Sequence, residues 1–305
     1  MKSKGLKRGF TIIELLTVMS IIVVLMGILM PSFAAIRRYA KAVKQKGAFH
    51  DIATGLEMFS IDFDGYPDSK GTLGTNPGPY NLDVDGAAYC GAIRLCEAMF
   101  GKDGFGFHPE SRFTMNGASD SAGTINYYPK PITDENRRQR KHPYIDTDKH
   151  KTTRLSELYD VTQAGCAYSA DPCETVICDV FSKVKGRTTG AKIGLPILYY
   201  KADTTKLGND PNDDHFVPQA LNIYDLRDNR DIDGLVVDGI TGANPLHDGI
   251  TTAPTKTASE VFYSVIRDKK FINASKPYNE NSYILISAGW DGLYGTKDDV
   301  YNFGE

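Results

Sequence analysis

The chain has 305 residues, of which 41% are hydrophobic and 24% charged, and its formal net charge at pH 7 is −3. A chain of this size and composition can bury a substantial core, and its acidic balance argues against a general nucleic-acid binder. We find no low-complexity linker and no internal repeat in the sequence, which favours one elaborated domain.

A basic leader and a long apolar run open the chain. Glycine 9 ends the leader, which holds four basic residues: Lys2, Lys4, Lys7 and Arg8. Residues 10–30 follow as 21 positions in which Glu14 is the only formal charge. Because about 20 apolar helical residues span a bilayer core, 10–30 is predicted to be a transmembrane segment with its basic flank in the cytoplasm. A carboxylate at that depth is costly and indicates a functional contact.

Two ordinary explanations of this run account for only part of it. A secretory signal peptide would have a shorter apolar core and a small-residue cleavage site after it, for which residues 31–35 offer only a weak candidate. A plain membrane anchor explains the length of the run and its basic flank. It gives no reason for Glu14.

The segment 7–15 reads Lys-Arg-Gly-Phe-Thr-Ile-Ile-Glu-Leu and resembles the class III signal of type IV pilins and type II secretion pseudopilins. The resemblance implies cleavage between Gly9 and Phe10 by a prepilin peptidase, followed by N-methylation of Phe10. It also implies that Glu14, then the fifth residue, pairs with the free amino terminus of a neighbouring subunit. Loss of the leader would take the formal charge from −3 to −7.

Apolar residues spaced three or four apart predict that the helix continues over 31–64 as an amphipathic segment. Pro31 lacks an N–H and is expected to kink or locally melt it. The run Asp64-Gly-Tyr-Pro67 should end it, and its pattern resembles the close of the long helix in major, G-type pseudopilins. Residues 65–305 would then form the exported globular domain.

That domain combines long loops with a few short elements. Residues 68–190 are rich in Gly, Asp, Asn and Pro, and within them 88–100 is predicted to be a helix. The runs 195–202 and 283–288 predict strands, whereas 260–266 fits either a helix or a strand. We therefore expect an α+β, pilin-like fold, in which a long N-terminal helix packs on a small antiparallel sheet with loop insertions.

The cysteines leave two alternatives open. There are five of them, at Cys90, Cys96, Cys166, Cys173 and Cys178. Local disulfides, Cys90 with Cys96 and two of the other three together, suit an exported domain. Buried free thiols are an equal alternative. The spacing contains no Cys-x-x-Cys pair, which makes a zinc site improbable.

The last strand runs into a loop rich in glycine and aspartate. Asp291, Asp298 and Asp299 offer three carboxylates, and Gly289, Gly292 and Gly295 permit a tight turn. The loop resembles the C-terminal calcium site of G-type pseudopilins, which implies a calcium ligand set of Asp291, the Leu293 carbonyl, Asp298 and Asp299. An acidic surface turn is the plain alternative. The other acidic runs, at 225–233, 83–86 and 209–214, are expected to be solvated loops, and the first of them lacks calcium-loop spacing.

No catalytic motif stands out in the sequence: the histidines form no metalloprotease pattern and there is no P-loop, so we expect no enzyme activity.

The resemblance implies a structural subunit of a type II secretion pseudopilus, single-pass in the bacterial inner membrane with its C-terminal domain in the periplasm. The resemblance implies as partners copies of itself, the prepilin peptidase, the inner-membrane platform and minor pseudopilins, but no nucleic acid. The alternatives are a type IV pilin for adhesion or DNA uptake, or a pilin-anchored ligand-binding protein or enzyme.

Overall fold

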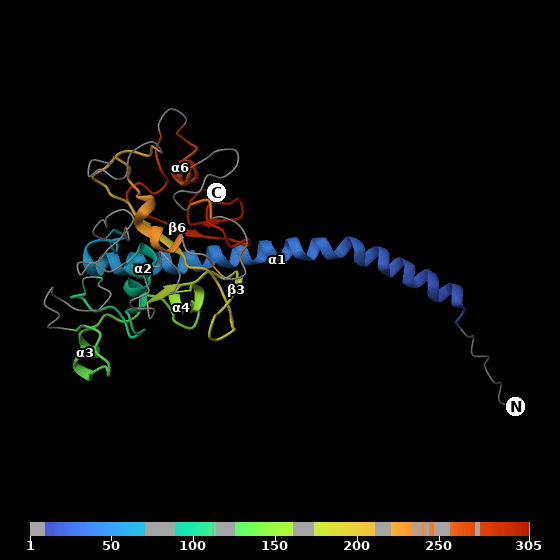
Figure 1. The fold of residues 1–305 in the computed structure, drawn as a ribbon, viewed down its shortest axis with the longest axis horizontal. Coiled ribbons are helices and arrows are strands. Elements are labelled where there is room, and N and C mark those ends of the chain that lie inside the picture. Colours follow the sequence, from blue (N-terminus) through green and yellow to red (C-terminus); the bar gives the residue numbers. More distant parts are fainter. Residues whose placement is uncertain are drawn as a thin grey trace. The chain divides into compact units, whose positions relative to one another are not determined.

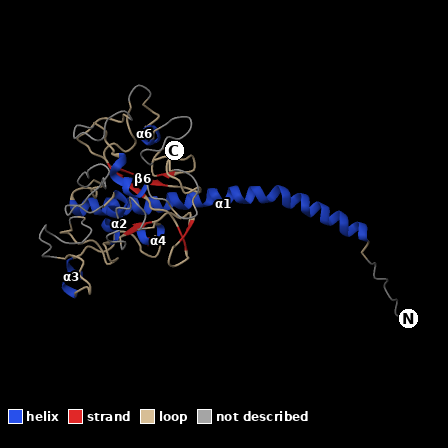
Figure 2. Cartoon of the chain, in the orientation of Figure 1, coloured by secondary structure: helices blue, strands red, loops and turns tan. Residues whose placement is uncertain are grey.

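A computed structural model describes most of the chain, namely residues 10–70, 89–111, 113, 126–160, 174–210, 221–233, 237, 240, 244–246, 257–271 and 275–304. The chain divides into two compact units, Met1–Val43 and Lys44–Glu305. Helices, short strands and long loops all contribute to the second unit (Figures 1 and 2). The expected α+β class, a long N-terminal helix with small antiparallel sheets, is confirmed.

Helix α1 covers Ile12–Phe63 and is continuous, so the expected local melting at Pro31 does not occur. A proline removes only one intrahelical hydrogen bond, and the helix continues on both sides of it. The helix ends where the sequence predicted. Asp64 adopts a left-handed φ of 56°, and the Gly65 N–H donates to the Ser60 carbonyl at 3.1 Å, as in a Schellman cap.

From Lys44 onward, α1 is part of the second unit. Its predicted apolar face is buried there, at Phe49, Ile52, Leu56 and Phe59. The loop of residues 141–150 contacts this part of α1. Ile145 lies against Gly55, and Lys141 Nζ and Tyr144 Oη reach Asp62 at 3.0 and 2.8 Å.

The main sheet has the order β5-β6-β7, with β5 at Leu198–Lys201, β6 at Tyr283–Ser287 and β7 at Val300–Tyr301. Both pairings are antiparallel, and β6 is fully buried. This confirms the two strands predicted from their β-branched and aromatic runs. The sheet joins residues far apart in the chain, since Leu198 pairs with Ile286, 88 positions away.

Two helices pack with this sheet. Helix α2 covers Gly91–Phe100 and every residue in it is buried, in agreement with the prediction for 88–100. Helix α6 covers Ala258–Ile266, which resolves the open choice at 260–266 in favour of a helix. The reason is local: Thr257 and Glu260 form a capping box, which satisfies N–H groups at the helix start.

The remaining elements are short and were not predicted from the sequence. They are α3 (Asp134–Gln139), β1 (Thr152–Arg154), α4 (Leu155–Leu158), β2 (Thr175–Ile177), β3 (Val184–Lys185), β4 (Lys192–Ile193), the 3-10 helix η1 (Leu226–Asn229) and α5 (Arg230–Asp233). Strand β1 pairs with β2, and β3 with β4, both antiparallel. A strand of two or three residues is too short to show the alternation of apolar and polar residues by which strands are recognised in a sequence.

A buried asparagine joins the start of α2 to β5. Asn229, fully buried, accepts from the Ala92 N–H and donates to the Tyr199 carbonyl, each at 2.8 Å. Gly91 lies at the closest point, because a Cβ there would be 2.2 Å from the Tyr199 carbonyl oxygen. This position therefore requires glycine for steric reasons.

Three of the five cysteines, Cys90, Cys96 and Cys178, are buried free thiols. Of the two alternatives, the Cys90–Cys96 disulfide is wrong, because six helical steps of about 1.5 Å place the two Cα atoms about 9 Å apart and a disulfide requires them within about 7 Å. Cys166 and Cys173 lie outside the described residues.

Candidate functional site

The first candidate site is the start of α1. Thr11 is the last residue before the helix and Glu14 lies in its first turn. The Thr11 N–H and hydroxyl both donate to Glu14 Oε2, at 2.9 and 2.8 Å, and the Glu14 N–H points back to Thr11 Oγ1 at 3.3 Å. This reciprocal arrangement is a capping box. It gives the carboxylate two hydrogen-bond donors from its own chain.

Thr11 is thus a neighbour of Glu14 that our sequence analysis did not single out. Its signal was readable, because a threonine three residues before a glutamate at a helix start is the capping-box pattern. Of the predicted processing residues, Phe10 is the first described residue and is 78% exposed, whereas Gly9 lies outside the described part.

Between Glu14 and Pro31 the helix carries no charged residue and is predominantly apolar on all sides. An 18-residue window of α1 has a mean hydropathy of 2.7, and none of it is buried within this chain. A helix that is hydrophobic all round needs an apolar environment, which a bilayer or a bundle of similar helices supplies. By length and composition, α1 can cross a membrane.

The second candidate site is the loop between β6 and β7. Gly289, Gly292 and Gly295 all have positive φ, at 66°, 81° and 91°, as the predicted tight turn requires. The closest approach is at Gly289, where a Cβ would lie 2.2 Å from the Asp298 carbonyl oxygen. The glycines therefore fold the loop back on itself and bring its two acidic ends together.

Asp291 and Asp298 form a carboxyl pair. Asp298 Oδ2 accepts from the Asp291 N–H at 2.8 Å, and the two side chains are hydrogen-bonded to one another. Burial is the largest cause that raises the pKa of Asp291, and the nearby Asp298 charge adds to it. Burial also acts to raise the pKa of Asp298, but hydrogen bonds from Thr296 and the Asp291 N–H outweigh it and lower that pKa.

Asp299 is held by a different set of donors. Its carboxylate accepts from the Gly295 N–H at 2.7 Å, the Thr296 N–H at 3.3 Å and the Tyr301 hydroxyl at 3.0 Å. Burial raises its pKa to about 7 despite these bonds. The Asp299 carboxylate therefore stabilises the loop through hydrogen bonds from the backbone N–H groups of Gly295 and Thr296.

These observations allow a test of whether the loop suits calcium. Among the described residues, no three His, Cys, Asp or Glu side chains gather as a metal cluster. Calcium also accepts carbonyl oxygens, so a shell could be built on the Asp291 and Asp298 carboxylates and loop carbonyls such as that of Leu293. A cation there would neutralise the charge of the two neighbouring carboxylates. Asp299 as a direct ligand stays a prediction.

The acidic run 225–233 differs from the expected solvated loop. Asp225 caps η1 through the Arg227 N–H, and Asp228 is only 4% exposed. The Ser69 hydroxyl donates to Asp228 Oδ2 at 2.5 Å and accepts from the Lys201 N–H at 2.9 Å. Burial, followed by the Asp225 charge, raises the pKa of Asp228 to about 8. The run was misread because nothing in its composition reveals which carboxylate is buried.

Comparison with known families gives one match. Residues 5–30 match the model of the prokaryotic N-terminal methylation motif. No curated protein and no solved structure matches the chain. The motif supports a subunit of the type IV pilin-like class, and together with α1 it is compatible with a single-pass membrane anchor. It covers Glu14 and both predicted processing residues.

Proposed function

We propose that this protein is a structural subunit of a type II secretion pseudopilus, made as a prepilin and polymerised from the bacterial inner membrane to drive protein export. The methylation motif over residues 5–30 carries the proposal. It is supported by the exposed apolar length of α1, which needs partners in a membrane or a filament. Its partners would be copies of itself, the prepilin peptidase, the inner-membrane platform and minor pseudopilins.

Processing prepares the chain for assembly. Cleavage between Gly9 and Phe10 removes the charged leader and creates an ammonium group one residue before the Thr11 cap. In a monomer, the Thr11 donors satisfy Glu14 in part. In the polymer, the amino terminus of a neighbouring subunit would neutralise its charge. A buried carboxylate is tolerable when it is paired, and removal of one partner of such a pair is strongly unfavourable.

The choice of a secretion subunit over a type IV pilin depends on the two ends of the exported part. The turn at Gly65-Tyr-Pro67 and the Asp291–Asp299 loop are the features that resemble the major secretion pseudopilin. A calcium ion held by Asp291, Asp298 and loop carbonyls would lock the β6–β7 connection in the periplasm. Loss of export without loss of adhesion or DNA uptake, in a strain deleted for this chain, would separate the two functions.

The assembly step is tested with Glu14→Ala, with Ser20→Ala as the matched control. Ser20 lies in the same apolar helix and its hydroxyl bonds only the Thr17 carbonyl among the described contacts, so its loss removes a polar group without removing a charge. Both variants should be processed to the mature length, because the leader is unchanged. Ser20→Ala should form filaments in sheared fractions and Glu14→Ala should not. Filaments of normal yield from Glu14→Ala would refute the pairing.

A further inference from the structure

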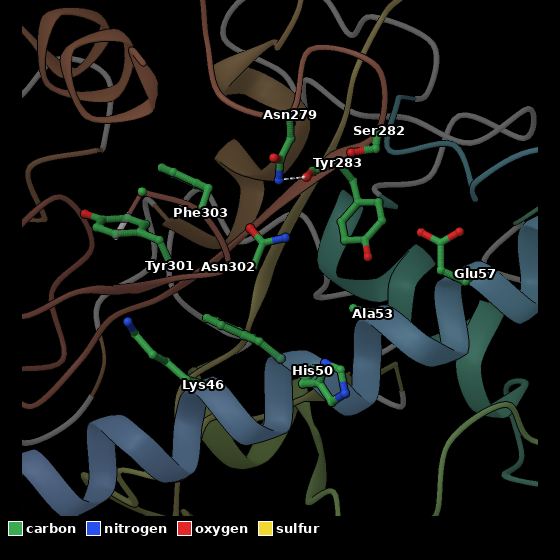
Figure 3. A pocket seen from close by; sticks show the side chains of 12 residues that line it. Lys46, His50, Ala53, Glu57, Asn279, Ser282, Tyr283, Tyr301, Asn302 and Phe303 are labelled. Carbon is green, nitrogen blue, oxygen red and sulfur yellow. Dashed lines mark hydrogen bonds between the residues drawn. The ribbon is translucent and has the colours of Figure 1, made fainter. Parts of the chain in front are cut away.

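A cavity of about 480 Å³ opens between α1 and the C-terminal part of the chain (Figure 3). One wall is a single face of α1, from Lys46 to Glu57, and the other comes from residues 279–283 and 301–304. All of these residues belong to the second unit. The proposed secretion function makes no use of this cavity.

The α1 wall has opposite charges at its two ends. Lys46 and Glu57, both exposed, are 11 residues apart on the helix, which places them about 16 Å apart along its axis. His50 lies one turn from Lys46, at the same end. Between the charged ends lies Ala53, whose small side chain leaves the middle of the wall open (Figure 3).

Aromatic rings line the middle and close the Glu57 end. Phe49 and Tyr283 are both nearly fully buried and face the cavity. The Tyr66 hydroxyl donates to Glu57 Oε1 at 2.7 Å, and its ring packs edge-on against Tyr283 with centroids 4.9 Å apart. The cavity is therefore a groove with an apolar centre, a cationic end and an anionic end.

The floor of the groove is an interrupted sheet edge. The Ser282 carbonyl accepts from Ala202, which turns the peptide groups of Tyr283 away from β5 and toward the β7 side. Strand β7 does not extend as far as Tyr283, and side-chain amides bond the backbone of β6 in its place. Asn279 Nδ2 donates to the Tyr283 carbonyl at 3.1 Å, and Asn302 Oδ1 accepts from the Leu285 N–H at 2.8 Å. Figure 3 shows the Asn302 amide between Tyr301 and Tyr283.

We propose that this groove binds a short extended peptide segment of a partner protein, acidic at one end, basic at the other and aromatic in the middle. At about 3.3 Å per residue, a 16 Å groove accommodates about five extended residues. The acidic end would lie at Lys46 and His50, the basic end at Glu57 and the aromatic side chain over Ala53. A neutral sugar would also suit the rings and amides, but it offers nothing to the two charged ends.

The test uses the full chain in lipid nanodiscs and three end-blocked, fluorescently labelled pentapeptides, followed by anisotropy. The peptides are Asp-Thr-Phe-Thr-Lys, Asp-Thr-Phe-Thr-Asp and Lys-Thr-Phe-Thr-Lys. The unmodified protein should prefer the mixed peptide over each of the others. Each matched end is worth about a factor of two to five, as for other exposed ion pairs. Glu57→Lys should shift the preference to the acidic peptide, and Lys46→Glu should shift it to the basic one.

Ala53→Trp is the control that fills the groove. Ala53 is half-buried at the cavity wall, so the larger side chain should abolish binding of all three peptides and leave the unfolding temperature unchanged. Equal affinity for the three peptides, the same order of preference in both charge variants, or binding that survives Ala53→Trp would each overturn the proposal. Binding of a glycan by the unmodified chain, with no peptide binding, would do the same.

Discussion

Two glycines on α1 provide a matched test of how the helix packs. At both Gly47 and Gly55, replacement by alanine should favour the helical state by about 1 kcal/mol through helix propensity alone. At Gly47, which is exposed, a Cβ would meet nothing within 4 Å. At Gly55, a Cβ would lie 2.6 Å from Ile145 Cγ2 and 2.9 Å from Met99 Sδ. Both neighbours are buried, so neither can move into solvent.

Overpacking of this kind costs about 1–3 kcal/mol. Because the propensity gain is common to both variants, the difference between them isolates the packing cost. We expect Gly47→Ala to unfold at a higher temperature than the parent, and Gly55→Ala to unfold about 2–12 °C below Gly47→Ala, at about 2–4 °C per kcal/mol. Circular dichroism melts of the full chain in detergent measure this difference.

A double-mutant cycle identifies the neighbour responsible. Ile145→Ala removes the methyl group that the new Cβ would meet, so Gly55→Ala should cost less in that background than in the parent chain. If Gly55→Ala is as stable as Gly47→Ala, the loop of residues 141–150 does not pack on α1 as described, and the reasoning fails.

Two further predictions concern carboxyl groups. The pKa of Asp228 is about 8 in the folded state and about 4 in the unfolded state. Between these two pH values the folded state keeps a proton that the unfolded state loses. The free energy of unfolding therefore falls as pH rises, by up to about 1.4 kcal/mol per pH unit. Urea unfolding from pH 5 to 8 should therefore show Asp228→Asn gaining on the parent chain as pH rises, whereas parallel profiles would contradict the buried proton. Calcium at a hundredfold excess over its Kd should stabilise the chain by about 2.7 kcal/mol and raise its unfolding temperature over that in chelator. Asp298→Ala should erase this rise and magnesium should not reproduce it, while equal melts in calcium and chelator would leave the loop an acidic turn.

The parts of the fold that follow from the sequence are those with long periodic signals. The apolar spacing at Phe49, Ile52, Leu56 and Phe59 predicted the buried face of α1, and the turn at Asp64 predicted its end. The β-branched and aromatic runs at 195–202 and 283–288 likewise predicted strands β5 and β6. Local melting was one of two outcomes expected at Pro31, and it does not occur in this helix of 52 residues, because a proline removes only one hydrogen bond. A kink at Pro31 stays a prediction.

The details of the sites depended on contacts that no local pattern carries. Glycine spacing predicted the tight β6–β7 loop, but not that Asp299 turns to the Gly295 and Thr296 N–H groups while Asp291 and Asp298 pair. The burial of Asp228 depends on Ser69, which lies 159 positions away in the chain. The groove is likewise built from two regions more than 200 residues apart, so neither region alone indicated it.

The central claim, that this chain is a prepilin-type subunit, is tested most directly at its amino terminus. Protein extracted from membranes of cells with an active prepilin peptidase is analysed by intact-mass and N-terminal peptide mass spectrometry. We expect a chain that begins at Phe10 and carries one methyl group on its amino nitrogen. When Gly9 is replaced by a bulky residue, the chain should accumulate with its leader. Recovery of the unmodified chain starting at Met1, with the peptidase active, would contradict it.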